Sequence, residues 1–186
     1  MREFALPSIA LLLVTAFAGG AGASGPTPPG FVDGTRLVDV LGDDNVRLEV
    51  TLGPTLLRPL LLADPTLQEV VGELESIYAL IVDLSDPETA RRAAAEAGAI
   101  EKRLVGEGWE RVARVRSDGG ERIQVLVRKA DGDDAHLSGL TVIVIDASGD
   151  EPIFVFANIT GLIDLGAIER LGDLDFPGIT GLDLEP

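Results

Sequence analysis

The chain has 186 residues, a formal net charge of −16 and no cysteine. The lack of cysteine excludes disulfides, thiol chemistry and lipid attachment through a cysteine. The negative charge and the 4% content of aromatic residues argue against nucleic-acid binding, which relies on basic patches and aromatic stacking.

Residues 1–23 have the pattern of a secretory signal peptide. The apolar run 5–18 is shorter than the ~20 residues that a membrane-spanning helix needs. Residues 21–23 (Ala-Gly-Ala) then form the small-x-small pattern of a signal-peptidase site, so we expect cleavage between Ala23 and Ser24 rather than an uncleaved anchor. The sequence thus predicts an exported protein, periplasmic or extracellular, with no stable membrane anchor after cleavage.

The rest of the chain divides into three parts. Residues 24–44 are predicted to be a linker and N-terminal segment, because 24–30 is rich in Pro and Gly. A single domain is expected over residues 45–172, which is long enough to bury a core. Residues 173–186 are acidic, are interrupted by Gly and Pro, and are predicted to form a tail.

Hydrophobic periodicity predicts both helices and strands in the domain. The predicted strands cover 46–52, 77–84, 109–116, 122–129, 140–146 and 153–159. The predicted helices cover 54–62, 64–74, 86–106 and 165–171, and Asp64 and Asp86, each followed by Pro, are typical helix starts. The order of elements ends in an antiparallel meander. It therefore indicates an α+β two-layer sandwich, mainly antiparallel, with helices on one face of the sheet.

The stretch 108–129 holds the only Trp of the chain and six of its 15 Lys and Arg residues. Five of its apolar residues, Ala113, Val115, Ile123, Val125 and Val127, are odd-numbered. Directly opposed residues of an antiparallel pair share a face. A three-residue loop at 118–120 keeps odd opposite odd, and it is a loop class that uses Gly at a left-handed position. In this register Arg116 faces Arg122 and Arg114 faces Gln124. Because opposed like charges are destabilising, a negative group should compensate them.

Two interpretations of Arg114, Arg116 and Arg122 are open. We favour neutralisation by the protein's own carboxylates, such as Glu49 or Glu121, because surface charge clusters alone are weak signs of a site. The other interpretation is a binding patch for a small anion or an acidic partner segment, which arginine clusters often recognise.

Two conspicuous residues are interpreted as structural. Trp109 follows a helix-ending glycine and begins a strand, so we expect it to seal that corner rather than to serve as a ligand platform. Asn158 begins a glycosylation pattern, but it lies within an apolar strand where a sugar would disrupt packing.

No catalytic residue is predicted, and no enzymatic activity is expected. His136, the only His, lies with Ser138 in a predicted polar loop, and neighbouring loop residues do not form a catalytic triad. Asp131, Asp133 and Asp134 in the same loop are candidate calcium ligands, although the EF-hand pattern with its terminal Glu is missing. Neither a P-loop nor a dinucleotide-binding motif occurs, so no cofactor is expected.

The predicted strands 140–146 and 153–159 carry apolar residues on both faces. A two-layer sandwich covers one face of its sheet, so the second face needs a cover from residues 31–41, from the tail or from another chain. A homodimer joined sheet to sheet is the simplest form of the last possibility.

Several stretches together resemble the bacterial domain-of-unknown-function family 4252: VTLGPTLLRPLL, IYALIVDL, GWERVARVR, ERIQVLVRKADG and GLTVIVIDASGDEPIFVFANITGLIDLGAIERLG. The resemblance covers about residues 45–172 and is most specific at Gly108-Trp109-Glu110 and at Asn158-Ile159-Thr160-Gly161 followed by Leu165. It implies a small exported protein or lipoprotein with an α+β domain and no established reaction. Many relatives carry a lipid-bearing Cys after the signal peptide, and this chain has none.

The resemblance also implies a context, because members of this family accompany extracytoplasmic sigma-factor systems. We therefore expect a non-enzymatic exported interaction domain in envelope signalling or stress response, with a protein partner in the envelope or a homodimer. The alternatives are a periplasmic small-anion or metal-binding protein, using the arginine face or the Asp loop, and a hydrolase.

Overall fold

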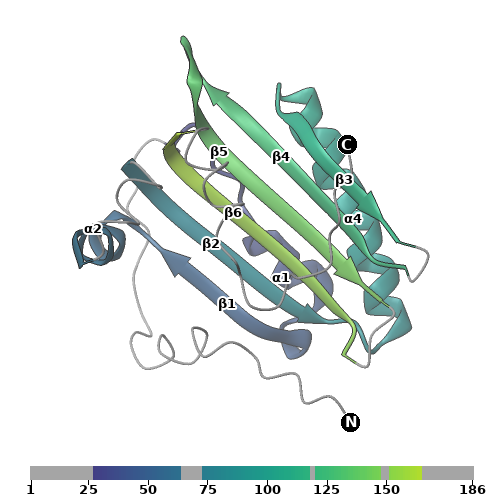
Figure 1. Ribbon diagram of the computed structural model, residues 1–186. Coiled ribbons are helices and arrows are strands. Elements are labelled where there is room, and N and C mark those ends of the chain that lie inside the picture. The colour runs from purple at the N-terminus through teal and green to yellow at the C-terminus, as the bar shows by residue number, and fades with distance from the viewer. Residues whose placement is uncertain (1–26, 64–72, 118–119, 148–150, 165–186) are drawn as a thin grey trace.

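The computed structural model describes residues 27–63, 73–117, 120–147 and 151–164, and its strands form one antiparallel sheet (Figure 1). The strand order is β1-β2-β6-β5-β4-β3. The strands are β1 (Val46–Leu52), β2 (Glu73–Asp83), β3 (Glu110–Arg116), β4 (Arg122–Ala130), β5 (Asp133–Asp146) and β6 (Ile153–Asp164). The helices are α1 (Thr35–Leu41), the short 3-10 helix η1 (Asp43–Asn45), α2 (Pro54–Ala63) and α4 (Pro87–Gly106). The predicted α+β class with a mainly antiparallel sheet is confirmed.

The start of α4 follows its sequence signals. An Asp86 carboxylate oxygen accepts a hydrogen bond of 2.8 Å from the backbone N–H of Thr89, and Pro87 occupies the first turn. This bond lowers the pKa of Asp86. The side chain thereby satisfies one of the N–H groups that a helix start leaves without a partner.

The end of α4 is a Schellman motif. The N–H of Trp109 bonds to the carbonyl of Leu104 at 2.9 Å and that of Gly108 to the carbonyl of Val105 at 3.2 Å. Gly108 has a φ of +89°, a conformation that suits glycine. Trp109 is only 4% exposed, so its indole closes the helix-to-strand corner, as the sequence predicts.

Helices α1 and α4 pack against the same face of the sheet (Figure 1). The small side chains of Ala93 and Ala97 on the buried side of α4 let the helix backbone lie close to the strands. The main buried cluster contains Leu37, Leu41, Ala93, Ala97, Ile100 and Leu104 from the helices, and Tyr78, Leu80, Val82, Leu126, Ile143, Ile145, Phe154 and Phe156 from the sheet.

Asn158 ties the residues before α1 to the middle of this face, and its side chain is fully buried. Its carbonyl oxygen accepts the N–H of Val32 at 3.0 Å, while its amide nitrogen donates to the carbonyl of Gly30 at 3.1 Å and to the hydroxyl of Thr141 at 3.0 Å. Gly30 has a φ of +83°, and a Cβ there would lie 2.1 Å from the carbonyl oxygen of Ser138. The backbone at Gly30 therefore lies closer to the sheet than any residue with a side chain would permit.

This fastening excludes one of the three candidate covers for the second face of the sheet. Residues 31–41 do not shield the second face of the sheet, since Val32, Leu37 and Leu41 pack into the cluster under α4. The hydrogen bonds of Asn158 hold the segment on the helix-covered side.

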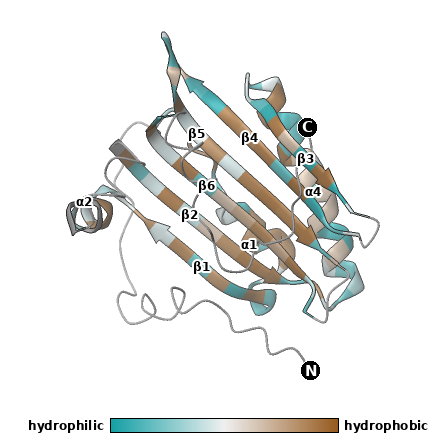
Figure 2. Cartoon of the chain, in the orientation of Figure 1, coloured by the Kyte–Doolittle hydropathy of each residue, from teal (hydrophilic) through white to brown (hydrophobic). Residues whose placement is uncertain are grey.

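We call the other side of the sheet the open face. Helix α2 contacts only one end of it, where Leu57 joins a second cluster with Leu52, Ile77, Leu140 and Ile159. Hydrophobic colour runs across the sheet (Figure 2). Beyond α2 the open face is lined by half-buried apolar side chains, namely Leu48, Val50, Ala79, Ile81, Ala113, Val115, Ile123, Val125, Val142, Val144, Val155 and Ala157.

Some boundaries differ from the prediction. Strand β2 already includes Leu74, which the periodicity assigned to a helix, and β5 begins at Asp133 within the predicted polar loop. In β5 the backbone pairs with two neighbouring strands, with Leu137 opposite both Lys129 and Ile163, so ladder hydrogen bonds outweigh the polar composition. The predicted signal peptide, most of the predicted helix 64–74, the predicted helix 165–171 and the tail lie outside the described residues.

We predict that Asn158→Ala destabilises the domain by about 3 kcal/mol, because it leaves the buried N–H of Val32 without an acceptor and creates a cavity. Urea unfolding followed by circular dichroism measures the loss. Thr141→Val is the matched control: it removes one acceptor of the same network, and about 1 kcal/mol is expected. Equal losses in the two variants would contradict a special role for Asn158.

Candidate functional site

The β3–β4 hairpin has the register that its sequence predicts. Arg116 lies opposite Arg122, and Arg114 lies opposite Gln124. The N–H of Ser117 bonds to the carbonyl of Glu121 at 3.0 Å, and Gly120 has a φ of +93°. The three-residue loop and its glycine with positive φ are confirmed.

A β-bulge at Val112 changes the face on which one arginine lies. Arg111 pairs with Leu126 and Ala113 pairs with Val125, so the single partner step is matched by two residues of β3. Without the bulge, Arg111 and Arg114 would project from opposite faces, because side chains alternate along a strand. With it, both arginines lie on the side of the sheet that α4 covers.

Glu101 of α4 is the carboxylate that these arginines share. Arg111 pairs with one of its oxygens, and Arg114 approaches the other at 3.1 Å. The amide nitrogen of Gln124 donates to the same oxygen as Arg114 at 3.0 Å. The Glu101 side chain is only 12% exposed, so the helix presents a nearly buried carboxylate to the basic hairpin.

Arg116 and Arg122 differ from their neighbours. Both side chains are exposed, and neither forms an ion pair with any residue that the structure describes. The carbonyl oxygen of the Gln124 side chain is buried and has no hydrogen-bond partner there. Among the described residues, four arginines thus share one face with a single paired carboxylate, and the two at the hairpin tip have no carboxylate partner there. Both interpretations of the arginine face stay open for this tip.

Sequence reasoning missed Glu101, Arg111 and Gln124 as members of this group. It named Glu49 and Glu121 as candidate neutralising groups, whereas Glu49 accepts a hydrogen bond of 3.0 Å from the Tyr78 hydroxyl. Burial, followed by this contact with Glu49, raises the pKa of Tyr78. A usable signal did exist. Glu101 follows Ala97 by four residues on the apolar stripe of α4, and an acidic residue in such a stripe needs a partner.

Two of the three aspartates of the predicted calcium loop, Asp133 and Asp134, have different partners. Asp133 accepts the N–H of Ala135 at 2.9 Å and contacts His136 Nδ1 at 2.7 Å, and these two bonds lower the pKa of Asp133. The side chain of Asp134 is 98% exposed and lies 3.7 Å from Lys129. Within the described part of the chain, no group of three or more His, Asp or Glu side chains is arranged to hold a metal ion. Calcium binding stays a prediction.

His136 and Ser138 lie on β5 rather than in a loop. The Ser138 hydroxyl donates to the carbonyl of Lys129 at 3.1 Å, whereas His136 is engaged with Asp133. A cleft of about 360 Å³ lies nearby, between the end of α4 and the β4–β5 turn. Charged side chains of both signs line it, among them Glu107, Glu110, Arg128, Lys129 and Asp131.

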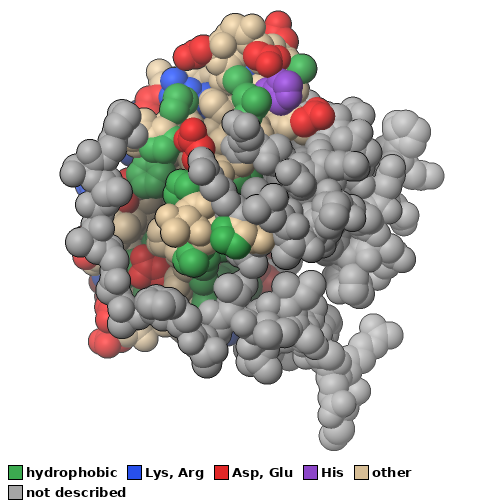
Figure 3. Space-filling view, turned by 90° about the vertical axis from the view of Figure 1, so that its left-hand side faces the viewer, with side chains coloured by type: hydrophobic (Ala, Val, Ile, Leu, Met, Phe, Trp, Pro, Cys, Tyr) green, Lys and Arg blue, Asp and Glu red, His purple; other side chains and the backbone are tan. Residues whose placement is uncertain are grey.

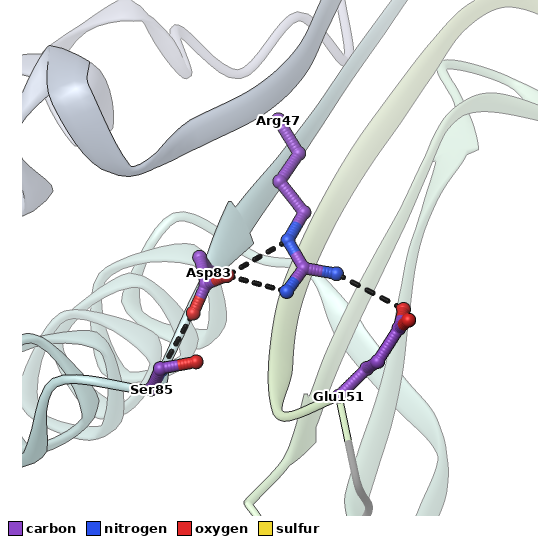
Figure 4. Close-up of polar contacts among 4 residues, drawn as sticks. All are labelled: Arg47, Asp83, Ser85 and Glu151. Atoms are coloured by element: carbon purple, nitrogen blue, oxygen red, sulfur yellow. Dashed lines mark hydrogen bonds and ion pairs between the residues drawn. The ribbon is translucent and has the colours of Figure 1, made fainter.

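A separate ion-pair group lies where β1, β2 and β6 meet (Figure 4). The guanidinium of Arg47 contacts Asp83 through two nitrogens and reaches Glu151 at 3.2 Å. Hydrogen bonds from Ser85, followed by that from Arg47, lower the pKa of Asp83 to about 2. This group joins the edge strand β1 to β2 and to the residue before β6.

The chain belongs to the family described as Domain of unknown function (DUF4252), whose profile matches residues 42–171. No curated protein and no solved structure matches the chain. Among the helices of the described residues, none has the length and apolar character needed to cross a bilayer.

We predict that Glu101→Gln destabilises the domain by about 1–2 kcal/mol, because Arg111 and Arg114 lose their carboxylate. The expected loss of stability is small because both arginine side chains are more than a third exposed, so solvent screens their charges. Urea unfolding at low and high salt measures the loss, which should shrink at high salt. Glu96→Gln on the same helix is the control, and a loss of the same size there would contradict the assignment.

A second prediction concerns acid. The pKa of Asp83 is lowered from 3.8 to about 2 on folding, so the ionised group stabilises the protein above pH 3.8, and this contribution disappears as the pH falls through about 2. The melting temperature of the wild type should therefore exceed that of Asp83→Asn near neutral pH, and the gap should close between pH 4 and pH 2. Thermal melts of both proteins across this range test it, and a gap that does not vary with pH contradicts it.

Proposed function

We propose that this protein is an exported, non-enzymatic interaction domain that binds a second copy of itself through the open face of its sheet. The observation that carries the proposal is the row of half-buried apolar side chains across all six strands, beyond the end that α2 contacts. Extended apolar surface of this kind is typical of an interface. Its central residues, such as Val142, Val155 and Ala157, come from neighbouring strands and form one continuous surface.

Charge favours a second copy as the partner. The chain carries a net charge of −16, so two copies repel each other over most of their surfaces. The central residues that line the open face are uncharged, while Asp83 and Asp146 project from the same side at one end of their strands. In the view from the α2 and β1 side, hydrophobic side chains lie beside acidic ones (Figure 3). A two-fold interface places the same patch on both sides, and an uncharged apolar patch meets this condition without like-charge contacts.

A non-enzymatic role is supported by the state of the reactive side chains. Ser138 donates its hydroxyl to a backbone carbonyl and His136 contacts Asp133, so the two are not coupled as nucleophile and base. The hydrolase alternative would need another nucleophile. Export is supported by the signal-peptide pattern of residues 1–23, and a role in envelope signalling or stress response is our extension of that location.

The second candidate function is small-anion binding. It is favoured by Arg116 and Arg122, which face each other without a carboxylate among the described residues. An anion that binds only the folded protein raises its melting temperature, so a rise with added sulfate, lost in Arg116→Gln, would support this candidate over a purely structural hairpin.

Val155→Lys should convert the dimer into a folded monomer, because a charge at the centre of the open face would be buried against its own copy. Sedimentation equilibrium measures the mass, and circular dichroism checks the fold. Val105→Lys, at a position 49% exposed on α4, is the matched control and should stay dimeric. If Val155→Lys does not fold, Val142→Thr should still weaken the dimer. A wild type that is monomeric at millimolar concentration would refute the proposal.

A further inference from the structure

The outer edge of β3 is open to another strand within the part of the chain that the structure describes. β3 is the last strand of the sheet, at the side opposite β1 (Figure 1). Its side chains are mostly exposed, with Val112 at 54%. An edge of this kind presents unpaired N–H and C=O groups, and it can accept one more strand by backbone pairing.

The register of the hairpin decides which backbone groups point outward. The N–H of Ser117 bonds to the carbonyl of Glu121 at 3.0 Å, so these two residues belong to a hydrogen-bonded pair. In an antiparallel ladder such pairs alternate with pairs whose residues form no hydrogen bonds to each other. Arg114 and Arg116 therefore belong to the non-bonded pairs, and their N–H and C=O groups point away from β4.

A strand that pairs with this edge meets arginine on one face and an apolar side chain on the other. The residues directly opposite Arg114 and Arg116 share their face, on the side of α4, and the residue between them shares the face of Val115. Acidic residues match the two arginines, and an apolar residue matches Val115. The bulge at Val112 interrupts regular pairing, so the match covers three residues. The edge thus selects the pattern acidic, apolar, acidic.

Charge at the hairpin tip favours such a strand over a second copy of β3. Glu101 pairs with Arg111 and Arg114, whereas Arg116 and Arg122 have no ion pair with any residue that the structure describes. A carboxylate opposite Arg116 adds an ion pair at this tip. A second β3 strand would instead set arginine against arginine, which is destabilising.

We propose that the outer edge of β3 binds an extended segment of another protein, antiparallel to β3, with the pattern acidic, apolar, acidic. The net charge of −16 repels a strongly acidic partner, so the segment carries few carboxylates beyond these two. The inference rests on the small-anion candidate, because it names a peptide carboxylate as the anion and adds backbone pairing to its recognition. It is independent of the open-face dimer.

Binding of a short peptide to the full chain tests the proposal. The probe is the end-capped heptapeptide Thr-Val-Asp-Val-Asp-Val-Thr, and isothermal titration calorimetry measures its Kd. Lysine in place of both aspartates should abolish binding. Methylation of the two aspartate amide nitrogens should also abolish it, because these N–H groups point to β3 while the charges are unchanged. Methylation of the valine between them, whose N–H points away from β3, is the matched control and should preserve binding.

Residue-resolved hydrogen exchange locates the peptide on the protein. With the peptide at about ten times its Kd, the amides of Arg114 and Arg116 should exchange about tenfold more slowly, whereas that of Val115, which points to β4, should change little. Arg116→Gln should weaken binding about fivefold, since one exposed ion pair is lost. Arg36→Gln removes the same charge from an exposed position on α1 and should leave binding unchanged.

Several results would overturn the proposal, and they separate it from the small-anion candidate. Equal binding of the aspartate-methylated peptide would mean that charge alone is recognised. If the peptide does not bind but sulfate raises the melting temperature, only the small-anion candidate survives, and no response to either defeats both. Slow exchange of the Arg114 and Arg116 amides without peptide would mean that the edge is already covered. Dilution then identifies the cover, since protection by a second copy falls on dilution and protection by the protein's own chain does not.

Discussion

The hydrogen bonds of the buried Asn158 amide hold the segment before α1 on one face of the sheet. By bonding to the backbone of Gly30 and Val32, the amide commits the segment before α1, and α1 with it, to the side that α4 covers. A buried amide makes such a commitment firm, because each of its groups is costly to leave unpaired. On the other side, among the described helices only α2 packs against the sheet, and it does so at one end. The open face is thus a consequence of the Asn158 network rather than an independent feature.

The basic hairpin shows how one backbone irregularity settles an electrostatic problem. Arginines at odd and even positions of a regular strand would lie on both faces, and Arg111 would project into the apolar open face. The bulge at Val112 moves it to the α4 side, where one nearly buried carboxylate serves two guanidinium groups. The second ion pair costs less conformational entropy than the first, because Glu101 is already held by one arginine and by Gln124. Arg116 and Arg122, at the hairpin tip, form no ion pair with Glu101.

Sequence reasoning predicted correctly those features that depend only on local signals, such as the spacing of apolar residues and the odd or even position of residues in a strand. The Arg116–Arg122 register follows from odd-numbered apolar residues and a three-residue loop, and both ends of α4 follow from local capping signals. It failed where long-range contacts decide. The seven residues of α1 contribute only Leu37 and Leu41 to the buried core, too few to show a helical period. The bonds of Asn158 to Gly30 and Val32, just before the helix, could not be read from the sequence. The bulge at Val112 leaves no compositional mark, so Arg111 could not be assigned to the arginine face. The start of β5 was hidden by its polar residues, which β4 and β6 hold in register from both sides.

The placement of positive charge in this acidic chain has a physical consequence for association. An edge strand with unpaired backbone groups is an aggregation hazard, and proteins protect such edges with charged side chains and bulges. β3 has both, in Arg114 and Arg116 and in the bulge at Val112. Arginine on an edge repels an identical edge but attracts a carboxylate, so the same residues that prevent pairing between β3 strands permit pairing with an acidic segment. The apolar centre of the open face has the opposite property, since it carries no charge that would repel an identical surface. The centre of the open face and the edge of β3 therefore differ in the surfaces that their charge permits them to meet.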